Sequence, residues 1–260
     1  MAAYAAQIAV ESMRADLFLF THGLAPSRET AKKLICGGCV RLSGVSVRKP
    51  SEDIPDGTDL GMFEILASEA TRYVSRGGLK LEAALDYFGI SVAGVRALDI
   101  GASTGGFTDC LLSRGASFVT AVDSGHGQLA PRLAADARVL SLEGVNARVL
   151  TAELVGSGFD IAVMDVSFIS QTYILPNIPP LLAAGGILVS LIKPQFEVGR
   201  ENIGKGGIVR SDAARRQAVE NVCAAAEAAG FERIGVMTSP IEGGDGNIEY
   251  LGYFRRAANR

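Results

Sequence analysis

Two charged residues of this sequence follow apolar segments that have the length of strands. Asp165 ends the segment 159–165, and Lys193 comes directly after the almost entirely apolar segment 186–192. If both segments belong to one parallel sheet, their carboxyl ends meet at the edge where such sheets bind ligands. A buried charge is costly unless it has a partner, and a lysine beside a carboxylate can receive or steer a proton. Both residues could otherwise be surface charges or helix caps.

The stretch 95–106 predicts a nucleotide pocket. A buried strand at 97–100 and a helix at 106–115 flank a glycine turn that is too tight for side chains. The turn lacks the G-x-G-x-x-G spacing of dinucleotide enzymes, because Ser103 stands where the second glycine must let the backbone approach a phosphate. Asp99 would repel a pyrophosphate, but it suits a ligand with an amino group and a sulfonium cation. S-adenosylmethionine is such a ligand.

A second apolar segment, 118–122, ends in Asp123, 22 residues after Gly101. This spacing fits one βαβ unit, in which the carboxylate accepts hydrogen bonds from both ribose hydroxyls; the alternative is an acidic helix cap. Asn146 follows a third predicted strand, 139–142, where an adenine edge could be recognised. The predicted cofactor-binding residues are Asp99, Gly101, Ala102, Ser103, Thr104, Gly105, Gly106, Phe107, Asp123, Ser124, Asn146 and Asp165.

Strands alternate with helices along most of the chain, and each strand ends in a polar residue. This order predicts a doubly wound α/β sheet whose ligand crevice lies at the strand ends. The segment 169–184 contains three prolines, so we expect its helix to be interrupted or to start late. Further predicted elements are a helix at 79–88 that carries Lys80, a helix at 211–229, and a closing hairpin at 231–238 and 247–254 with Glu249 on its last strand.

Basic residues gather near the N-terminus. Residues 28–49 contain six basic side chains and one acidic side chain, although the whole chain has a net charge of −3. A first helix is predicted at 12–22, and a second helix from Ser27 would place three of these basic residues on one face. The alternating segment 40–47, with Gly44 at its turn, predicts a hairpin. Such a basic surface either binds a nucleic-acid backbone or is simply solvated.

Length and composition limit the classes of protein. A chain of 260 residues with 48% hydrophobic content and 31 glycines suits one α/β domain plus a smaller one. No apolar run has the roughly 20 residues that a membrane span needs, and residues 1–12 lack the pattern of a signal peptide, so we expect a cytoplasmic protein. The four cysteines are expected to be reduced thiols and no metal is expected, because the two histidines lack ligand spacing.

The N-terminal part resembles the αL-type RNA-binding domain shared by a small-subunit ribosomal protein, pseudouridine synthases and tyrosyl-tRNA synthetases. The matching pattern is Arg14-Ala-Asp16, Gly23-Leu24, Ser27-Arg28, Ala31, Leu34-Ile35, Gly38, Val40, Gly44 and Lys49-Pro50-Ser51. In that family the basic helix and hairpin lie on an RNA backbone. The resemblance implies RNA-binding roles for Arg14, Arg28, Lys32, Lys33, Arg41 and Lys49.

The chain from about Met13 to Phe254 resembles the TlyA (haemolysin A) family of ribosomal RNA 2′-O-methyltransferases. The order Lys80, Asp165, Lys193, Glu249 also matches the catalytic tetrad of the RrmJ/FtsJ-type ribose 2′-O-methyltransferases. The strings that carry the resemblance are residues 75–81, 98–109, 127–129, 146–148, 165–170, 191–197, 204–207 and 246–250.

This resemblance implies a Rossmann-like class I methyltransferase with a mostly parallel seven-stranded sheet, preceded by a small α+β αL-type RNA-binding domain. It implies S-adenosylmethionine as cofactor and a cytidine of ribosomal RNA, within ribosomal subunits, as substrate. Lys193 would orient the ribose hydroxyl, while Asp165 and Glu249 would position Lys193 and Lys80. The expected parts are a flexible N-terminus at 1–11, the RNA-binding domain at 12–66, a linker at 67–76 and the methyltransferase domain at 77–260.

Three other functions stay open from the sequence. A non-catalytic RNA-binding factor for ribosome assembly would not need the tetrad. A membrane-damaging haemolysin would need an apolar segment that the sequence lacks. A small-molecule methyltransferase would leave the basic N-terminal domain without a task.

Overall fold

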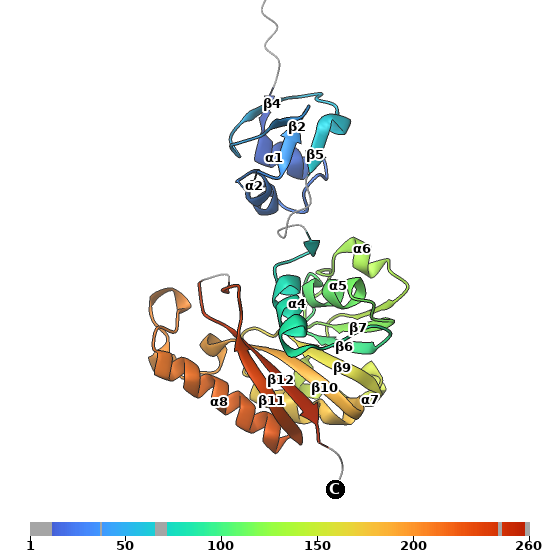
Figure 1. Ribbon diagram of the computed structural model, residues 1–260, viewed down its shortest axis with the longest axis vertical. Coiled ribbons are helices and arrows are strands. Elements are labelled where there is room, and N and C mark those ends of the chain that lie inside the picture. The colour runs from blue at the N-terminus through green and yellow to red at the C-terminus, as the bar shows by residue number, and fades with distance from the viewer. Residues whose placement is uncertain (1–11, 37, 66–71, 244–245, 258–260) are drawn as a thin grey trace, which may run out of the picture. The chain divides into compact units, whose positions relative to one another are not determined.

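The computed structural model describes residues 12–36, 38–65, 72–243 and 246–257. The chain divides into two compact units, Met1–Arg72 and Tyr73–Arg260 (Figure 1). The predicted N-terminal segment 1–11 and positions 67–71 of the predicted linker lie outside the described residues. The domain boundaries expected from the sequence therefore remain predictions.

The first unit joins two helices to short antiparallel strands. Residues 12–14 were expected to begin a helix, but they form a strand because Met13 pairs with Ile54 of another strand. The predicted hairpin is present, and Ser43 and Gly44 both have positive φ angles, 50° and 79°, as a two-residue hairpin turn requires. The elements are β1 (Ser12–Arg14), α1 (Ala15–Thr21), α2 (Arg28–Cys36), β2 (Val40–Leu42), β3 (Val45–Ser46), β4 (Asp53–Pro55), η1 (Leu60–Met62) and β5 (Phe63–Ile65).

The second unit is built on a seven-stranded sheet with the strand order β11-β12-β10-β9-β6-β7-β8. Strands β10, β9, β6, β7 and β8 run parallel, whereas β12 and β11 are antiparallel additions at one edge. The expected mostly parallel sheet is thus confirmed. The bounds are β6 (Arg96–Ile100), β7 (Phe118–Val122), β8 (Val139–Leu142), β9 (Phe159–Met164), β10 (Leu182–Ile192), β11 (Phe231–Thr238) and β12 (Tyr250–Arg256).

Helices cover both faces of this sheet (Figure 1). Neighbouring residues of a strand point to opposite faces: Val163 of β9 belongs to the apolar cluster of Leu81 on α4, whereas Met164 belongs to that of Val222 on α8. Both faces are buried, which explains the continuous apolar runs in the sequence. The helices are α4 (Gly77–Phe88), α5 (Gly106–Ser113), α6 (Pro131–Ala134), α7 (Ala152–Val155) and α8 (Asp212–Ala228).

Two segments differ from the sequence-based expectation. The segment 169–184, expected to be an interrupted α-helix, instead contains three short 3₁₀ turns, at Gln171–Tyr173, Leu175–Asn177 and Pro179–Leu181, and from Leu182 it is part of β10. Proline removes the backbone donors that an α-helix needs. Strand β12 begins at Tyr250, so Glu249 lies just before the last strand and not on it.

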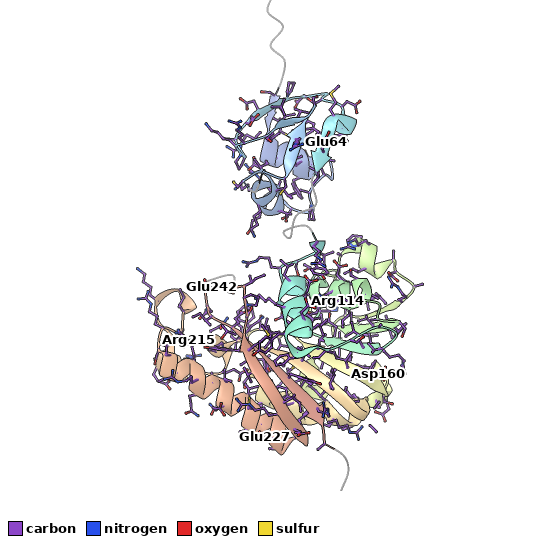
Figure 2. All side chains as sticks on the ribbon, viewed as in Figure 1. Glu64, Arg114, Asp160, Arg215, Glu227 and Glu242 are labelled. Atoms are coloured by element: carbon purple, nitrogen blue, oxygen red, sulfur yellow. The ribbon has the colours of Figure 1, made fainter. Side chains whose placement is uncertain are left out.

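Side chains fill the interior of the second unit, and charged residues such as Asp160 and Glu227 lie at its periphery (Figure 2). Arg114, at the end of α5, donates hydrogen bonds to Asp86 and Glu82 of α4 at 2.5 and 3.0 Å and so joins the two helices. Within the described ranges, no helix has the length and apolarity to cross a membrane. The described residues also contain no group of three potential ligands arranged around a metal ion.

Candidate active site

Asp165 and Lys193 meet at the carboxyl edge of the sheet. They follow the neighbouring parallel strands β9 and β10, in which Met164 lies opposite Ser190. Lys193 Nζ lies 2.6 Å from Asp165 Oδ1 and donates a hydrogen bond to Ser167 Oγ at 2.8 Å. The strand ends therefore place an ammonium, a carboxylate and a hydroxyl together at the position that the sequence predicted.

Lys80 and Glu249 form a second ion pair. Lys80, in the first turns of α4, is 7% exposed, and Glu249 is 2% exposed. Lys80 Nζ donates to Glu249 Oε2 at 2.5 Å. Lys80 is therefore not a surface lysine, and each buried charge compensates the other.

Three cavities surround these pairs. Lys80, Asp165 and Lys193 line a cavity of 290 Å³. An adjoining cavity of 720 Å³ lies over the glycine turn, and Glu249 and Lys193 line a third of 340 Å³. Cavities of a few hundred cubic ångströms hold ligands of cofactor size. The predicted cofactor residues in the linings are Gly101, Ala102, Ser103, Thr104, Gly106, Phe107, Asp123, Ser124, Asn146 and Asp165.

Gly101 lets the turn after β6 approach the end of β9. Its φ angle is 85°, and a Cβ atom at this position would lie 2.4 Å from the backbone oxygen of Asp165. Only glycine adopts this conformation at low cost and leaves that space open. The turn and Asp165 thus form adjacent walls of the cavities of 290 and 720 Å³.

Asp123 organises the turn. Its Oδ2 accepts a hydrogen bond from the backbone N–H of Ser103 at 2.8 Å, and its Oδ1 accepts one from that of Gly125 at 2.7 Å. A carboxylate oxygen has two acceptor sites, so each oxygen retains one for a ligand hydroxyl. The described chain does not continue from Asp123 into a helix, which argues against the alternative of a helix cap.

The structure places two predicted cofactor residues differently. In the described part of the chain, Asp99 and Gly105 line none of these three cavities. Asp99 is fully buried and accepts a hydrogen bond from Thr108 Oγ1 at 2.6 Å. Burial raises the pKa of Asp99 from 3.8 to about 7, and the hydrogen bond from Thr108 only partly opposes this rise. Asp99 thus joins the end of β6 to α5 through Thr108, and its direct contact with a ligand stays a prediction.

Sequence reasoning did not assign roles to two residues beside Lys193. Ser167 lines all three cavities, and Phe168 lines two of them. Phe168 is 93% exposed, and its backbone has a φ angle of 64°. The centroid of its ring lies 5.2 Å from that of the Phe196 ring. The signals in the sequence were their position two and three residues after Asp165 and their place in the string 165–170 that carries the family resemblance. An exposed aromatic ring of this kind is suited to stacking on a nucleobase.

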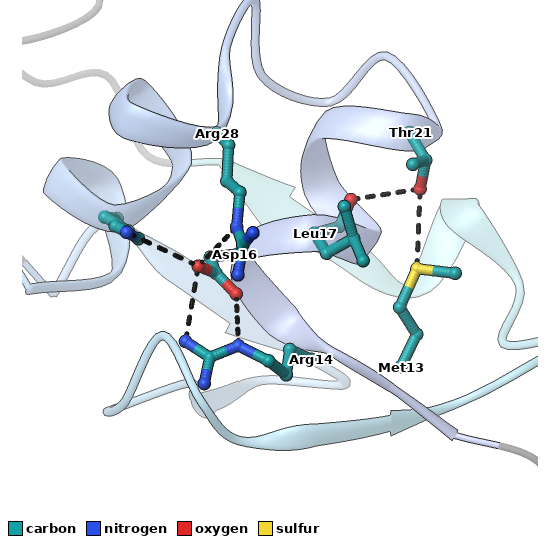
Figure 3. Close-up of polar contacts among 7 residues, drawn as sticks. Met13, Arg14, Asp16, Leu17, Thr21 and Arg28 are labelled. Atoms are coloured by element: carbon teal, nitrogen blue, oxygen red, sulfur yellow. Dashed lines mark hydrogen bonds and ion pairs between the residues drawn. The ribbon is translucent and has the colours of Figure 1, made fainter.

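Three of the predicted RNA-binding residues gather around Asp16 in the first unit (Figure 3). Asp16 is fully buried, and its carboxylate accepts hydrogen bonds from Arg14 Nε at 3.0 Å and Arg28 Nε at 2.9 Å. Lys32 Nζ lies 4.0 Å from the same carboxylate. The buried anion therefore orients three half-exposed cations. Of the other predicted RNA-binding residues, Lys33 pairs with Glu29, and Arg41 and Lys49 are exposed.

This cluster predicts an acid-sensitive first unit. Burial alone would raise the pKa of Asp16, but the hydrogen bonds from Arg14 and Arg28 outweigh it and lower the pKa from 3.8 to about 2. A lowered folded-state pKa stabilises the fold above pH 3.8, and this stabilisation is lost as the pH falls towards 2. Asp16→Asn should therefore increase hydrogen exchange in residues 12–36 at pH 7, with a difference from the parent that shrinks below pH 3.8.

Glu29→Gln is the matched control, because Glu29 is an exposed acid of the same unit, in the first turn of α2, the helix that carries Arg28 and Lys32. It should change exchange little at any pH. A difference between Asp16→Asn and the parent that stayed constant down to pH 2, after correction for intrinsic exchange rates, would contradict the role of the charged carboxylate.

The contacts of Asp123 predict its effect on ligand binding. Asp123→Asn keeps the shape but directs an amide N–H at one of the two backbone donors, Ser103 or Gly125. We expect about a 10-fold or greater rise in the dissociation constant of S-adenosylmethionine, since one hydrogen bond to a charged acceptor contributes about 1.5–3 kcal/mol. Isothermal titration calorimetry of the parent and the variant measures this dissociation constant. An unchanged constant in the folded variant would show that Asp123 does not serve the ligand site.

Comparisons with known proteins agree with both units. The family model for FtsJ-like methyltransferases matches residues 73–256, and the S4 domain model matches residues 13–60. The 16S/23S rRNA (cytidine-2'-O)-methyltransferase TlyA of Mycobacterium tuberculosis is 44% identical over 247 residues, which cover 95% of this chain and 91% of that protein.

Two further proteins are similar over nearly the whole chain. Hemolysin A of Brachyspira hyodysenteriae is 43% identical over 243 residues, which cover 93% of this chain and 99% of that protein. A solved structure of a protein from Streptococcus thermophilus that carries the name hemolysin has a TM-score of 0.72 at 44% identity, and the match covers 96% of this chain and 90% of that chain.

Proposed function

The chain belongs to the FtsJ-like methyltransferase family, and from this premise we propose that it transfers the methyl group of S-adenosylmethionine to the ribose 2′-hydroxyl of a cytidine in ribosomal RNA. The observation that carries the proposal is the contact of Lys193 with Asp165 and Ser167 beside the cavities of the glycine turn. The choice of cytidine and of ribosomal RNA follows from the name of the mycobacterial relative.

The residues of the turn fit S-adenosylmethionine. Gly101 leaves open a space that a Cβ would close, and Asp123 keeps acceptor sites for ribose hydroxyls. Asn146 lines the same cavity, and its Oδ1 accepts a hydrogen bond from the backbone N–H of Arg148 at 3.0 Å, so its amide N–H groups are the ones we assign to an adenine. When bound, S-adenosylmethionine supplies an electrophilic methyl group on a sulfonium.

The chain itself must align the hydroxyl and help its proton to leave. A lysine ammonium has three N–H donors. Lys193 Nζ donates one hydrogen bond to Ser167 Oγ and lies 2.6 Å from Asp165 Oδ1 as an ion pair, so donors remain for the ribose 2′-oxygen. Lys193 thus orients the hydroxyl, and Asp165 holds Lys193. The Lys80–Glu249 pair keeps a second ammonium at the same cavity without an uncompensated charge.

In this proposal the first unit binds the RNA. The S4 domain match and the cations around Asp16 support it, because oriented arginines bind phosphates in a fixed geometry. Each phosphate contact adds to affinity in a salt-dependent way. A cytoplasmic location is part of this proposal, because ribosomal RNA is its substrate.

Transfer of a labelled methyl group to ribosomal RNA tests the proposed function. Purified protein, S-adenosylmethionine with a labelled methyl group and unmodified ribosomal subunits should yield labelled ribosomal RNA. Binding of the subunits without label in the RNA would support a non-catalytic assembly factor instead and overturn the proposal.

A further inference from the structure

Two segments form the Lys193 site, and each extends one polar side chain to the other. The segment 165–172 follows β9 and includes the acidic and serine partners of Lys193. The segment 190–197 ends β10 and continues through the next turn. Gln171 reaches from the first segment to the second, and Glu197 reaches from the second to the first.

Gln171 uses both ends of its amide. It is 1% exposed, its Nε2 donates to the carbonyl oxygen of Leu191 at 2.6 Å, and its Oε1 accepts from Ser190 Oγ at 2.6 Å. Ser190 is fully buried. These partners lie two and three residues before Lys193. Because a buried amide without partners is costly, the end of β10 is held in one position relative to the segment after β9.

Glu197 makes the reciprocal contact. Its Oε1 accepts from the backbone N–H of Gln171 at 2.9 Å, and its Oε2 accepts from Ser170 Oγ at 2.6 Å. Burial raises the pKa of Glu197, and the two hydrogen bonds oppose that rise. The carboxylate therefore fastens the turn after Lys193 to the residues that follow Ser167.

The four hydrogen bonds fix the chain on both sides of Lys193. Those of Gln171 fix the chain before Lys193, and those of Glu197 fix the chain after it. Contacts of 2.6 and 2.8 Å from Lys193 Nζ would be lost by a displacement of one ångström between the segments. We propose that Gln171 and Glu197 are positioning residues that hold Lys193 against Asp165 and Ser167 for methyl transfer, an inference that rests on the proposed function.

The test separates turnover from binding. Gln171→Met has a similar length but lacks the amide, and we expect it to lower kcat by about 10- to 100-fold. The KM for RNA and the dissociation constant of S-adenosylmethionine should stay close to those of the parent, since Gln171 lines none of the three cavities of the described site. Glu197→Gln should cause a smaller loss, because its amide oxygen can still accept one of the two hydrogen bonds.

A double-mutant cycle tests the stated contact. Ser190→Ala removes the hydroxyl that donates to Gln171 Oε1, so it should lower kcat by itself. In the Gln171→Met background the same change should cost little more, because the hydroxyl has already lost its partner. Losses of kcat that multiply in the double variant would contradict the contact as the cause.

Phe159→Leu is the stability control. Phe159 is a buried core residue at the start of β9, at the opposite end from Asp165. It should lower the unfolding temperature and leave kcat unchanged. If Gln171→Met and Glu197→Gln kept the kcat of the parent, the inference would fail. If the parent transferred no methyl group to ribosomal RNA, the proposed function itself would fail.

Discussion

Lys193→Ala is expected to lower methyl transfer to ribosomal RNA by about 100- to 10,000-fold, the range over which a positioned proton-handling group contributes to catalysis. The ammonium that contacts Asp165 and Ser167 disappears, while the glycine turn that forms the cofactor cavity is untouched. Single-turnover kinetics with saturating S-adenosylmethionine measures the loss. Affinity for RNA should persist, because the cations around Asp16 lie in the other unit.

Lys205→Met is the matched control for this variant. Lys205 is an exposed lysine that lines none of the three cavities among the described residues. It should retain the turnover of the parent. If Lys193→Ala turned over as fast as Lys205→Met, the assignment of Lys193 to the reaction would be wrong.

Gly101→Ala is expected to abolish binding of S-adenosylmethionine and to destabilise the second unit by about 2–5 kcal/mol, the sum of a left-handed backbone and an overpacked contact. The added Cβ would lie 2.4 Å from the Asp165 backbone oxygen, and either the turn or Asp165 must move. Calorimetric titration with S-adenosylmethionine and thermal unfolding measure the two effects.

Gly89→Ala separates backbone strain from the clash. Gly89 ends α4 with a φ angle of 65°, and a Cβ there would meet nothing within 4 Å. Its cost should be only that of the left-handed conformation, about 1–2 kcal/mol, and the affinity for S-adenosylmethionine should stay unchanged. Equal effects of the two substitutions would show that the contact with Asp165 is irrelevant.

The sequence predicted the Lys193 and Asp165 contact because both residues end apolar segments, and neighbouring parallel strands bring such ends together. It also predicted the tight approach at Gly101, since a strand, a glycine turn and a helix permit few geometries. The pairing of Lys80 with Glu249 joins positions 169 residues apart. Their types and order suggested it only through a family resemblance, because no local pattern records a contact over that distance.

Other features depend on tertiary contacts that periodicity does not contain. The hydrogen bond of the buried Asp99 carboxylate with Thr108 of α5 is one such contact, and the predicted contact of Asp99 with a ligand stays a prediction. The bonds of Gln171 to the end of β10 involve uncharged side chains of ordinary type. Residues 12–14 became a strand only because a partner strand lies alongside them.

The position of the transferred methyl group tests the central claim most directly. Ribosomal RNA that the purified protein has labelled from S-adenosylmethionine would be hydrolysed with alkali, which cannot cleave the chain after a 2′-O-methylated ribose. The account predicts label in alkali-resistant dinucleotides that begin with a methylated cytidine, and none with Lys193→Ala. Label released in mononucleotides, with the methyl group on a base, would contradict it.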